Sequence, residues 1–317
     1  MTTLRPFIAL RPSGFRHLSG IRLSGFILFL LLVTARAAPD EVIVAGYNIE
    51  TYERVARLGE DGRILDKQKP EKEVDAVVRI IKDIGPDILG VCEMGPKDAF
   101  EDFKARLDQA GLGYRDFEYV DGPDPGRHLA LLSRYPIISR QSMPDVSYTL
   151  NGVEQKVKRG FLDVTVRISP DYTLRLVGAH LKSKLAAPEG EALVRRNEAH
   201  LLREHVEKIL GEDPSVNLLL YGDFNDTKNE PAIQEIMGVP HTPGYMADLW
   251  LQDSIGDRWT EYWKAADIYS RIDYIFVNGR LFHQIDLAKC SVYRSDYWQD
   301  ASDHRPVVAA IIPAKQP

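Results

Sequence analysis

Short apolar runs alternate with amphipathic stretches along most of the chain. Residues 41–47 are rich in β-branched side chains and end at Asn48, which predicts a buried strand. From Glu71 to Ile84 apolar residues recur at intervals of three and four, and Gly85-Pro86 follows, so a helix is predicted to end there. The same patterns predict a second helix over residues 189–210 and further strands over residues 87–92, 129–133, 162–168, 174–179, 216–221, 272–277 and 306–312.

The order of these elements bounds the fold. Strands mixed with helices indicate sheets covered by helices, and the hairpin-like strands between residues 129 and 179 indicate sheets that are not purely parallel. No repeat, low-complexity tract or linker interrupts residues 38–317, so one domain is the simplest interpretation. The chain has two cysteines, which excludes a disulfide-stapled scaffold and a four-cysteine zinc site.

The first 37 residues are expected to be a signal peptide rather than part of the fold. Four arginines from Arg5 to Arg22 precede an apolar run over residues 26–33, and Ala35-Arg36-Ala37 has the small-x-small pattern at which a signal peptidase cuts. The run is shorter than the roughly 20 residues of a membrane-spanning helix. An uncleaved anchor with a long basic leader is the alternative. The mature domain, residues 38–317, is expected to be periplasmic or secreted.

Without this leader the chain is acidic. Five arginines and no acid are lost with residues 1–37, so the formal net charge falls from −6 to −11. An acidic surface repels phosphate backbones at long range, which disfavours tight nonspecific binding to nucleic acid, although a local basic cleft can still accept one phosphate.

Polar residues gather at the ends of the predicted strands. Their oxygen atoms suit a hard divalent cation such as Mg²⁺, whereas the cysteines and closely spaced histidines that favour zinc are missing. Each residue alone has an ordinary explanation as a turn, a strand end or a core histidine, so the prediction of a site depends on their joint occurrence. The residues are Asn48, Glu93, His180, Asp223, Asn225, Asp303 and His304.

Six short motifs resemble, in the same order, those of the endonuclease/exonuclease/phosphatase family, the superfamily of deoxyribonuclease I. The resemblance extends over about residues 42–312. It implies a four-layer α/β sandwich, with two central mixed β-sheets flanked by helices. The motifs are Tyr47-Asn48-Ile49-Glu50, Ile88-Leu89-Gly90-Val91-Cys92-Glu93, His180-Leu181-Lys182-Ser183, Gly222-Asp223-Phe224-Asn225-Asp226, Arg271-Ile272-Asp273-Tyr274-Ile275-Phe276-Val277 and Ser302-Asp303-His304-Arg305-Pro306.

The resemblance implies a metal site. Glu93 is the main ligand of Mg²⁺, or of Mn²⁺ as an alternative, and Asn48 and Asp303 support it. The ion would act as a Lewis acid on a phosphate oxygen or on the leaving oxygen. Whether one metal binds or two is left open.

The resemblance also implies catalytic roles. Asp223 orients or deprotonates the attacking water or holds a second metal, and Asn225 donates to a phosphate oxygen; an extended chain would point both side chains the same way. Asp273 accepts a hydrogen bond from His304, which acts as a general base or as a charged donor. His180 is a donor to the phosphate or the acid that protonates the leaving group.

Three cations are candidate substrate-binding residues, each with a solvated surface charge as the alternative. Arg159 falls where deoxyribonuclease-like members place an arginine that contacts phosphate. Lys182 follows His180 by two residues and is expected on the same side of the chain. Arg127 precedes a predicted strand, where relatives carry varied substrate contacts.

Two further residues are given structural roles. Cys92 is expected to face the core, on the side of its strand opposite to Glu93, with a Cys92–Cys290 disulfide as the alternative. Ser302 is expected to hold the turn before Asp303 rather than act as a nucleophile, because no base is placed for it.

The sequence thus predicts an exported, magnesium-dependent phosphoester hydrolase, most simply a phosphodiesterase or nuclease that uses in-line attack of water. A phosphatase acting on lipid or inositol phosphates is one alternative, and a catalytically silent binding domain is another. The expected partner is the phosphoester substrate, with nucleic acid among the candidates. The chain is expected to be a monomer without a stable protein partner. The substrate is not specified, since one core of this fold hosts many phosphoesters.

Overall fold

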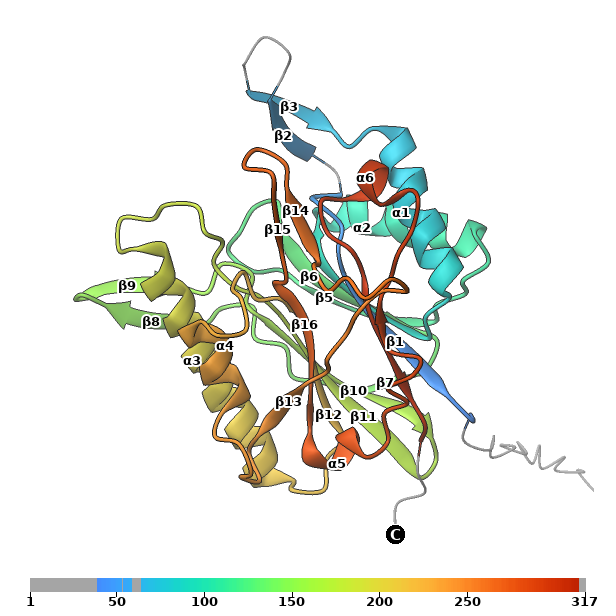
Figure 1. Cartoon of the computed structure of the whole chain (residues 1–317), viewed down its shortest axis with the longest axis vertical. Helices are drawn as coiled ribbons and strands as arrows, with labels where there is room; N and C mark the ends of the chain where they lie inside the picture. Colours follow the sequence, from blue (N-terminus) through green and yellow to red (C-terminus); the bar gives the residue numbers. More distant parts are fainter. Residues whose placement is uncertain (1–38, 53, 59–63, 314–317) are drawn as a thin grey trace, which may run out of the picture. The chain divides into compact units, whose positions relative to one another are not determined.

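Two mixed β-sheets of six strands each form the centre of the molecule, and helices cover their outer sides (Figure 1). The computed structural model describes residues 39–52, 54–58 and 64–313, so the expected signal peptide over residues 1–37 lies outside the described residues. The first sheet has the order β17 (Ser291–Val292), β18 (Val307–Ile311), β1 (Val42–Asn48), β4 (Ile88–Met94), β6 (His128–Ser133) and β5 (Asp116–Val120). The second has the order β13 (Met246–Asp248), β16 (Asp273–Asn278), β12 (Leu218–Asp223), β11 (Tyr172–His180), β10 (Phe161–Ser169) and β7 (Ile137–Arg140).

Side chains on the central strands alternate between two packing layers. On β12, Leu219 and Tyr221 belong to the apolar layer between the sheets, whereas Leu218 and Leu220 pack on the helical side. The first sheet packs its outer side on α1 (Glu71–Ile84) and α2 (Lys97–Gln109), and the second on α3 (Glu191–Glu212) and α4 (Pro231–Met237). The predicted four-layer α/β sandwich, two mixed sheets between helices, is confirmed.

Local sequence sets the element boundaries. α1 ends where Gly85 adopts a left-handed φ of 61° and its N–H donates to the carbonyl oxygen of Ile81, so the predicted helix over residues 71–84 is confirmed. Each predicted strand is present, with ends that differ by no more than two residues. α2 is not predicted, although its buried Phe100, Phe103 and Leu107 recur at helical spacing. The short helices α5 (Gly279–Phe282) and α6 (Trp298–Ala301) are also not predicted.

One tyrosine ring sets the distance between the two sheets near their polar end. Tyr221 is fully buried, and its hydroxyl donates to the carbonyl oxygen of Ala130, 3.3 Å away on the opposite sheet. A Cβ atom added at Gly90 would lie 2.1 Å from the Tyr221 ring, and one at Gly178 would lie 2.7 Å from it. Both positions therefore need glycine, because any other side chain would overlap the ring.

Three two-stranded hairpins lie outside the main sheets, and the sequence does not predict them. In Figure 1 the first extends at the top and the second at the left edge, while Glu261 of the third pairs with His304. The hairpins join β2 (Arg54–Leu58) to β3 (Ile64–Gln68), β8 (Ser147–Leu150) to β9 (Val153–Lys156), and β14 (Glu261–Trp263) to β15 (Ile268–Ser270). Within the described part of the chain, no helix has the length and apolar character needed to cross a membrane.

The two cysteines are free, so the alternative of a Cys92–Cys290 disulfide is wrong. Cys92 lies on β4 and Cys290 directly precedes β17, and β1 and β18 separate these strands in the sheet. Three strand spacings amount to about 14 Å, whereas a disulfide joins Cα atoms no more than about 7 Å apart.

Candidate active site

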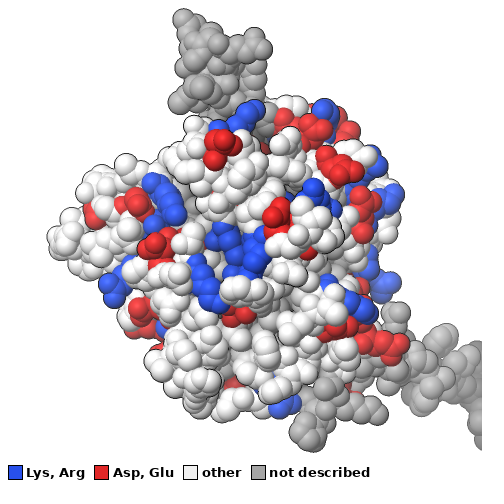
Figure 2. All heavy atoms as spheres, viewed as in Figure 1, with Lys and Arg blue, Asp and Glu red and all other residues white. Residues whose placement is uncertain are grey.

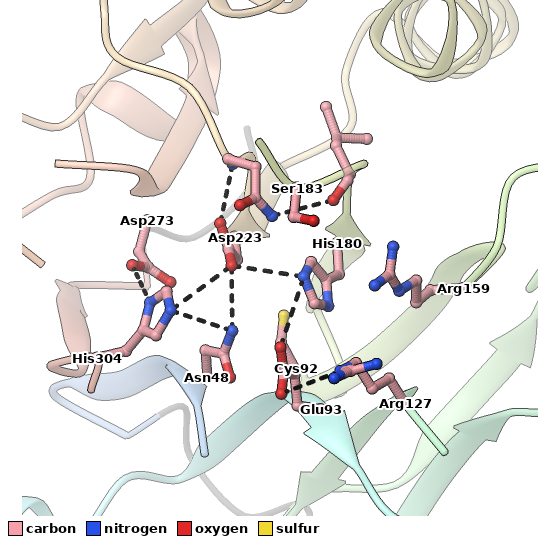
Figure 3. A network of polar contacts seen from close by, with 12 residues as sticks. Asn48, Cys92, Glu93, Arg127, Arg159, His180, Ser183, Asp223, Asp273 and His304 are labelled. Atoms are coloured by element: carbon pink, nitrogen blue, oxygen red, sulfur yellow. Dashed lines mark hydrogen bonds and ion pairs between the residues drawn. The ribbon is translucent and has the colours of Figure 1, made fainter. Parts of the chain in front are cut away.

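The predicted site residues meet at one end of the layer between the two sheets (Figure 3). Asn48, His180 and Asp223 are the last residues of β1, β11 and β12, and Asp273 is the first residue of the antiparallel strand β16. Each continues the inward-facing positions of its strand, and each is at most 3% exposed. Strand register places His180 beside Asp223, and Asp223 beside Asp273. The polar cluster is therefore a continuation of the inter-sheet core beyond its last apolar side chains.

Glu93 reaches this cluster through an irregularity in β4. The register of β4 against β6 shifts between Val91 and Met94, and Glu93 has a left-handed φ of 61°. As a result, Cys92 and Glu93 both point toward β11: the Cys92 Sγ lies 3.6 Å from the Ala179 carbonyl oxygen, and the Glu93 Oε1 lies 3.9 Å from His180 Nε2. Cys92 is in the core as expected, but the expected opposition of the two side chains is wrong, because the bulge breaks the alternation.

His304 is held by a buried carboxylate. Its Nδ1 lies 2.8 Å from the Asp273 Oδ2, within hydrogen-bond distance. Burial lowers the pKa of His304, but the charges of Asp273, Asp303 and Asp223 outweigh burial and raise it well above its usual value. The remaining ring nitrogen, Nε2, faces Asn48 Nδ2 at 3.4 Å and the Asp223 carboxylate at 3.8 Å. One nitrogen is thus fixed, and the other points into the cluster.

Asp223 lies at the centre of the network in Figure 3. Its carboxylate accepts hydrogen bonds from Asn48 Nδ2 at 3.1 Å and from the backbone N–H of Asn225 at 2.9 Å. Burial and the neighbouring charge of Asp273 raise the pKa of Asp223 to about 8, although His304 acts in the opposite direction. A carboxylate with two fixed donors and a raised pKa has the properties of a general base.

His180 has the opposite electrostatic environment from His304. Its Nε2 lies 3.5 Å from the Asp223 Oδ2, while its buried Nδ1 has no hydrogen-bond partner among the described residues. Burial and the nearby charge of Arg159 lower the pKa of His180 well below its usual value. His180 is therefore held as a neutral imidazole.

Asn225 corrects one expectation. Its φ is 54°, and its backbone N–H closes a turn onto Asp223, so the expected extended segment over these residues is wrong. The Asn225 side-chain amide donates to the carbonyl oxygen of Leu181 at 3.0 Å. The amide thus ties the turn after β12 to the segment after β11 and keeps one N–H for another acceptor.

The three candidate cations take different positions. Arg127 Nε lies 3.5 Å from the Glu93 carboxylate. Arg159 is buried beside His180, and its Nε lies 3.3 Å from the Asp124 carboxylate without hydrogen-bond geometry (Figure 3). The ammonium group of Lys182 donates to carbonyl oxygens of its own loop, including that of Ser183 at 2.9 Å. Arg127 and Arg159 thus border the cluster, whereas the ammonium group of Lys182 is occupied locally.

The donor set fits a hard divalent cation. Burial opposes ionisation of Glu93, but the neighbouring His180 ring, the charge of Arg127 and the hydrogen bond from Thr51 outweigh it and lower the Glu93 pKa to about 2. Asn48 adds an amide oxygen, and Asp303 adds a carboxylate that lies 3.8 Å from His304 Nε2 and is 44% exposed. Four carboxylates therefore face one cationic imidazole, that of His304, and the two bordering arginines. With all four ionised, the excess of negative charge is one that a bound cation would offset.

A second group of possible ligand atoms lies next to the donors Glu93, Asn48 and Asp303 and shares no residue with them. Asp223, Asp273 and His304 each offer an atom within 4.8 Å of the others. The His304 Nδ1 is already hydrogen-bonded to Asp273, which removes that nitrogen as a ligand. The oxygen donors of Glu93, Asn48 and Asp303 are the better fit for a hard ion.

The sequence does not single out the groups that support this cluster. The Thr51 hydroxyl donates to the Glu93 Oε2 at 2.8 Å, although Thr51 is β-branched and has a φ of 45°. Thr260 is fully buried, and its Oγ1 accepts the backbone N–H groups of Ile272 and Asp273 at 3.0 Å each. The only sequence signal for Thr51 is that it stands where some bacterial members of the resembled family carry a second asparagine.

α3 supports the cluster from the outer layer. The Glu198 Oε2 accepts the backbone N–H of Lys182 at 2.6 Å, and Arg195 Nη1 donates to the Lys182 carbonyl oxygen at 3.1 Å. Arg195 Nε also donates to the Asp226 carboxylate at 3.0 Å. Two buried charged residues of one helix thereby fix the segments that follow His180 and Asp223.

The turn at the other side of the cluster is held by a serine. The Ser302 hydroxyl donates to the Asn48 carbonyl oxygen at 2.8 Å and accepts the backbone N–H of His304 at 3.0 Å. The expectation that Ser302 holds this turn is confirmed.

A comparison with known families decides the identity of this arrangement. The model of the Endonuclease/Exonuclease/phosphatase family matches residues 47–304, which begins at the first predicted motif and ends at His304. The chain belongs to the endonuclease/exonuclease/phosphatase family. Enzymes of this family hydrolyse phosphoesters and in general depend on a divalent metal ion, so membership supports a phosphoester hydrolase. No curated protein matches this chain at a significant level.

Solved structures share the fold of this family member. The human Nocturnin catalytic domain is 17% identical with a TM-score of 0.62, and the match covers 87% of this chain and 95% of that one. An endonuclease/exonuclease/phosphatase from Bacteroides vulgatus is 20% identical with a TM-score of 0.60, covering 86% and 99%. Sphingomyelinase C from Streptomyces griseocarneus is 15% identical with a TM-score of 0.56, covering 86% and 99%. At these identities the similarity concerns the fold, not the substrate.

Proposed function

We propose that this chain is an exported, magnesium-dependent phosphodiesterase or nuclease that hydrolyses its substrate by in-line attack of water. The observation that carries the proposal is one polar cluster around Asp223. The hydrogen-bonded pair His304–Asp273 lies on one side of Asp223, and His180, which is close to the ionised Glu93, lies on the other. Charge on a phosphorus centre repels nucleophiles, so a hydrolase needs cationic and hydrogen-bonding groups converging on one point.

The metal would be held by Glu93, Asn48 and Asp303, the oxygen donors described above. Mg²⁺ suits this set because it keeps several waters and needs few protein ligands, and Mn²⁺ is the alternative. When bound, the ion neutralises charge on a phosphate oxygen or on the leaving oxygen.

The remaining steps are assigned to the chain's own residues. Asp223 is oriented by Asn48 Nδ2 and the Asn225 N–H, and it would accept a proton from the attacking water. Because Asp273 occupies Nδ1 of His304, Nε2 is the nitrogen left to donate to a phosphate oxygen. His180 lies on the other side of the Asp223 carboxylate and would donate to the same phosphate or to the leaving oxygen.

Two chromogenic substrates test this proposal. The purified chain is given bis(4-nitrophenyl) phosphate and 4-nitrophenyl phosphate, each with Mg²⁺, with Mn²⁺ and with a chelator. We expect faster release from the diester and loss of release with the chelator. Faster release from the monoester would replace the proposal with a phosphatase, and no release with any divalent metal would favour a silent binding domain. Digestion of a plasmid then tests nucleic acid directly.

Export is tested separately. After expression of the full chain in a bacterium, the N-terminus of the mature protein and its cellular fraction are determined. Cleavage that leaves Ala38 as the first residue supports the signal peptide. An intact N-terminus in the membrane fraction would support the anchor instead.

A further inference from the structure

Three cations surround one exposed tryptophan near the start of β16. Trp250, in the loop after β13, is 62% exposed. The guanidinium carbon of Arg258 lies 3.1 Å from its ring centroid, the Lys228 Nζ lies 4.6 Å from it, and the Arg271 guanidinium carbon lies 6.0 Å from it. We call these four residues the Trp250 patch. Figure 2 shows lysine and arginine side chains gathered near the middle of one face of the molecule.

The charge of the Trp250 patch is only partly balanced. Asp248 is buried beneath it and pairs with Lys228 at 3.1 Å and with Arg271. Arg258 donates through Nε to the carbonyl oxygen of Leu251, a neutral acceptor. Three positive charges therefore face one carboxylate, in a chain whose formal net charge is −6. Burial and the charge of Arg271 lower the pKa of Arg258 to about 10, so Arg258 remains a cation at neutral pH.

Two guanidinium groups of the patch also have unused donors. Arg258 Nη2 and Arg271 Nε are buried and lack an acceptor among the described residues. A buried donor without an acceptor is costly, and guanidinium groups are best satisfied by the paired oxygens of a phosphate or carboxylate. The other nitrogens of these two groups are partly used by Leu251, Asp248 and Leu249. Cations that are held together and keep one donor each without an acceptor favour the binding of an anionic ligand.

The patch is joined to the active site through the backbone. Arg271 precedes Asp273 by two residues, and Lys228 follows Asp226 by two. The single O–H of Tyr274 lies within hydrogen-bond distance of two carbonyl oxygens, that of Asp226 at 3.2 Å and that of Arg271 at 2.9 Å. The guanidinium carbon of Arg271 lies 4.5 Å from the centroid of the Tyr274 ring, which packs in the outer, helical layer, whereas Asp273 faces the layer between the sheets. An anion at the patch would therefore lie outside the reacting centre.

We propose that Lys228, Arg258 and Arg271 form a second anion site, separate from the catalytic cluster, that binds a phosphate group. The phosphate belongs either to a part of the substrate away from the scissile bond or to free inorganic phosphate. Binding to the patch does not require the proposed hydrolase activity. The link to a substrate phosphate rests on that proposed function.

Tryptophan fluorescence tests the site without any reaction. The full chain is titrated with inorganic phosphate and with pyrophosphate, because an anion that draws Arg258 from the Trp250 ring changes the emission of that ring. We expect saturable binding, weakened about tenfold in Arg258→Gln and retained in Arg258→Lys, since one charge-assisted contact is lost in the first variant and kept in the second. Trp250→Phe should remove the signal, and His304→Ala should leave it intact.

Two results would overturn the site. One is equal phosphate affinity in Arg258→Gln and the unmodified chain. The other is loss of phosphate binding in His304→Ala while Arg258→Gln binds phosphate normally, which would place the anion in the catalytic cluster. Circular dichroism of each variant confirms the fold. Failure of the proposed function has a different signature, namely no hydrolysis of either nitrophenyl ester while phosphate still changes the Trp250 signal.

Hydrolysis of bis(4-nitrophenyl) phosphate then separates the two sources of phosphate. If free phosphate is the ligand, filling the patch changes the rate with this small diester, and Arg258→Gln abolishes the change. If the patch binds a phosphate of the substrate, the small diester does not reach the patch. Added phosphate then changes the hydrolysis rate of the unmodified chain and of Arg258→Gln to the same extent.

Discussion

The two histidines of the candidate active site are both buried but have opposite electrostatic surroundings. His304 has a carboxylate 2.8 Å from one ring nitrogen, and its pKa is raised well above the usual value. His180 has no partner for its Nδ1 among the described residues and lies close to Arg159, and its pKa is lowered well below the usual value. Burial acts in the same direction on both, so the difference comes from the charge of the neighbours.

This contrast suits the two histidines to different functions, which could not be told apart from the residue type alone. A charged imidazole fixed by Asp273 is suited to stabilise negative charge on the phosphate, and a neutral imidazole beside Arg159 is suited to donate a hydrogen bond without adding charge. The two sides of the cluster are also built differently. The His304 side depends on a serine turn, whereas the His180 side depends on the buried charges of α3.

The largest expected effect comes from removing each imidazole in turn. His304→Ala is expected to lower kcat/KM for bis(4-nitrophenyl) phosphate by about 10⁴-fold, because both a donor and a positive charge are lost. His180→Ala, which removes only a neutral donor, is expected to cost about 10²-fold. Steady-state kinetics with matched circular dichroism spectra measure both. Equal losses would show that the two environments have no functional meaning.

A smaller effect is expected when the environment of His304 is changed but the ring is kept. Asp273→Asn leaves a hydrogen-bonding group at 2.8 Å but removes the charge, and a loss of about 10³-fold is expected because the ring orientation and its cationic form are no longer favoured. The Asp273→Glu variant, which retains the charge, serves as the control. Kinetics that are unchanged in Asp273→Asn would mean that the charge on Asp273 is not needed.

Glu198 of α3 is expected to make the free energy of unfolding depend on pH. Burial raises the pKa of Glu198 to about 7, from an unfolded value near 4.5. Between these values the folded chain binds a proton that the unfolded chain has released, so stability falls as pH rises, by about 3 kcal/mol for 2.5 pKa units. Urea unfolding at several pH values is expected to show this fall in the unmodified chain and a flatter dependence in Glu198→Gln. Parallel curves for the two proteins would contradict the assignment.

The smallest effect is expected at the serine turn beside His304. Ser302→Ala removes two hydrogen bonds and is expected to lower the free energy of unfolding by about 1 to 2 kcal/mol, with kcat reduced by less than about tenfold. Thermal unfolding and steady-state kinetics measure the two quantities. A loss of activity as large as that of His304→Ala would instead give Ser302 a chemical role.

Much of this arrangement is predictable from the sequence because four of the strands that carry it are regular at the end that bears the polar residue, although β4, which carries Glu93, is not. Asn48, His180, Asp223 and Asp273 continue the alternation of their strands, so locating the strand ends locates the side chains. Asn225 could not be placed in this way, because its left-handed turn reverses the direction that an extended chain would give.

The residues that support the cluster could not be predicted from sequence patterns, for a different reason. Glu198 and Arg195 lie on a helix that the periodicity predicts, but their contacts depend on which face of the second sheet the helix packs against. Thr51 depends on two left-handed residues and a bulge in another strand, none of which has a signal in composition or spacing. Local patterns specify elements, and tertiary contacts specify which of their polar groups meet.

The Tyr221 ring contacts both sheets close to the residues that each contributes to the candidate active site. It rests against Gly90, three residues before Glu93, and against Gly178, two residues before His180, while Asp223 follows it by two on its own strand. Any widening of the sandwich at this ring would move Glu93, on the first sheet, away from His180 and Asp223, on the second. The distance between the sheets thus sets the relative positions of these three groups, and that distance depends on glycine at positions 90 and 178.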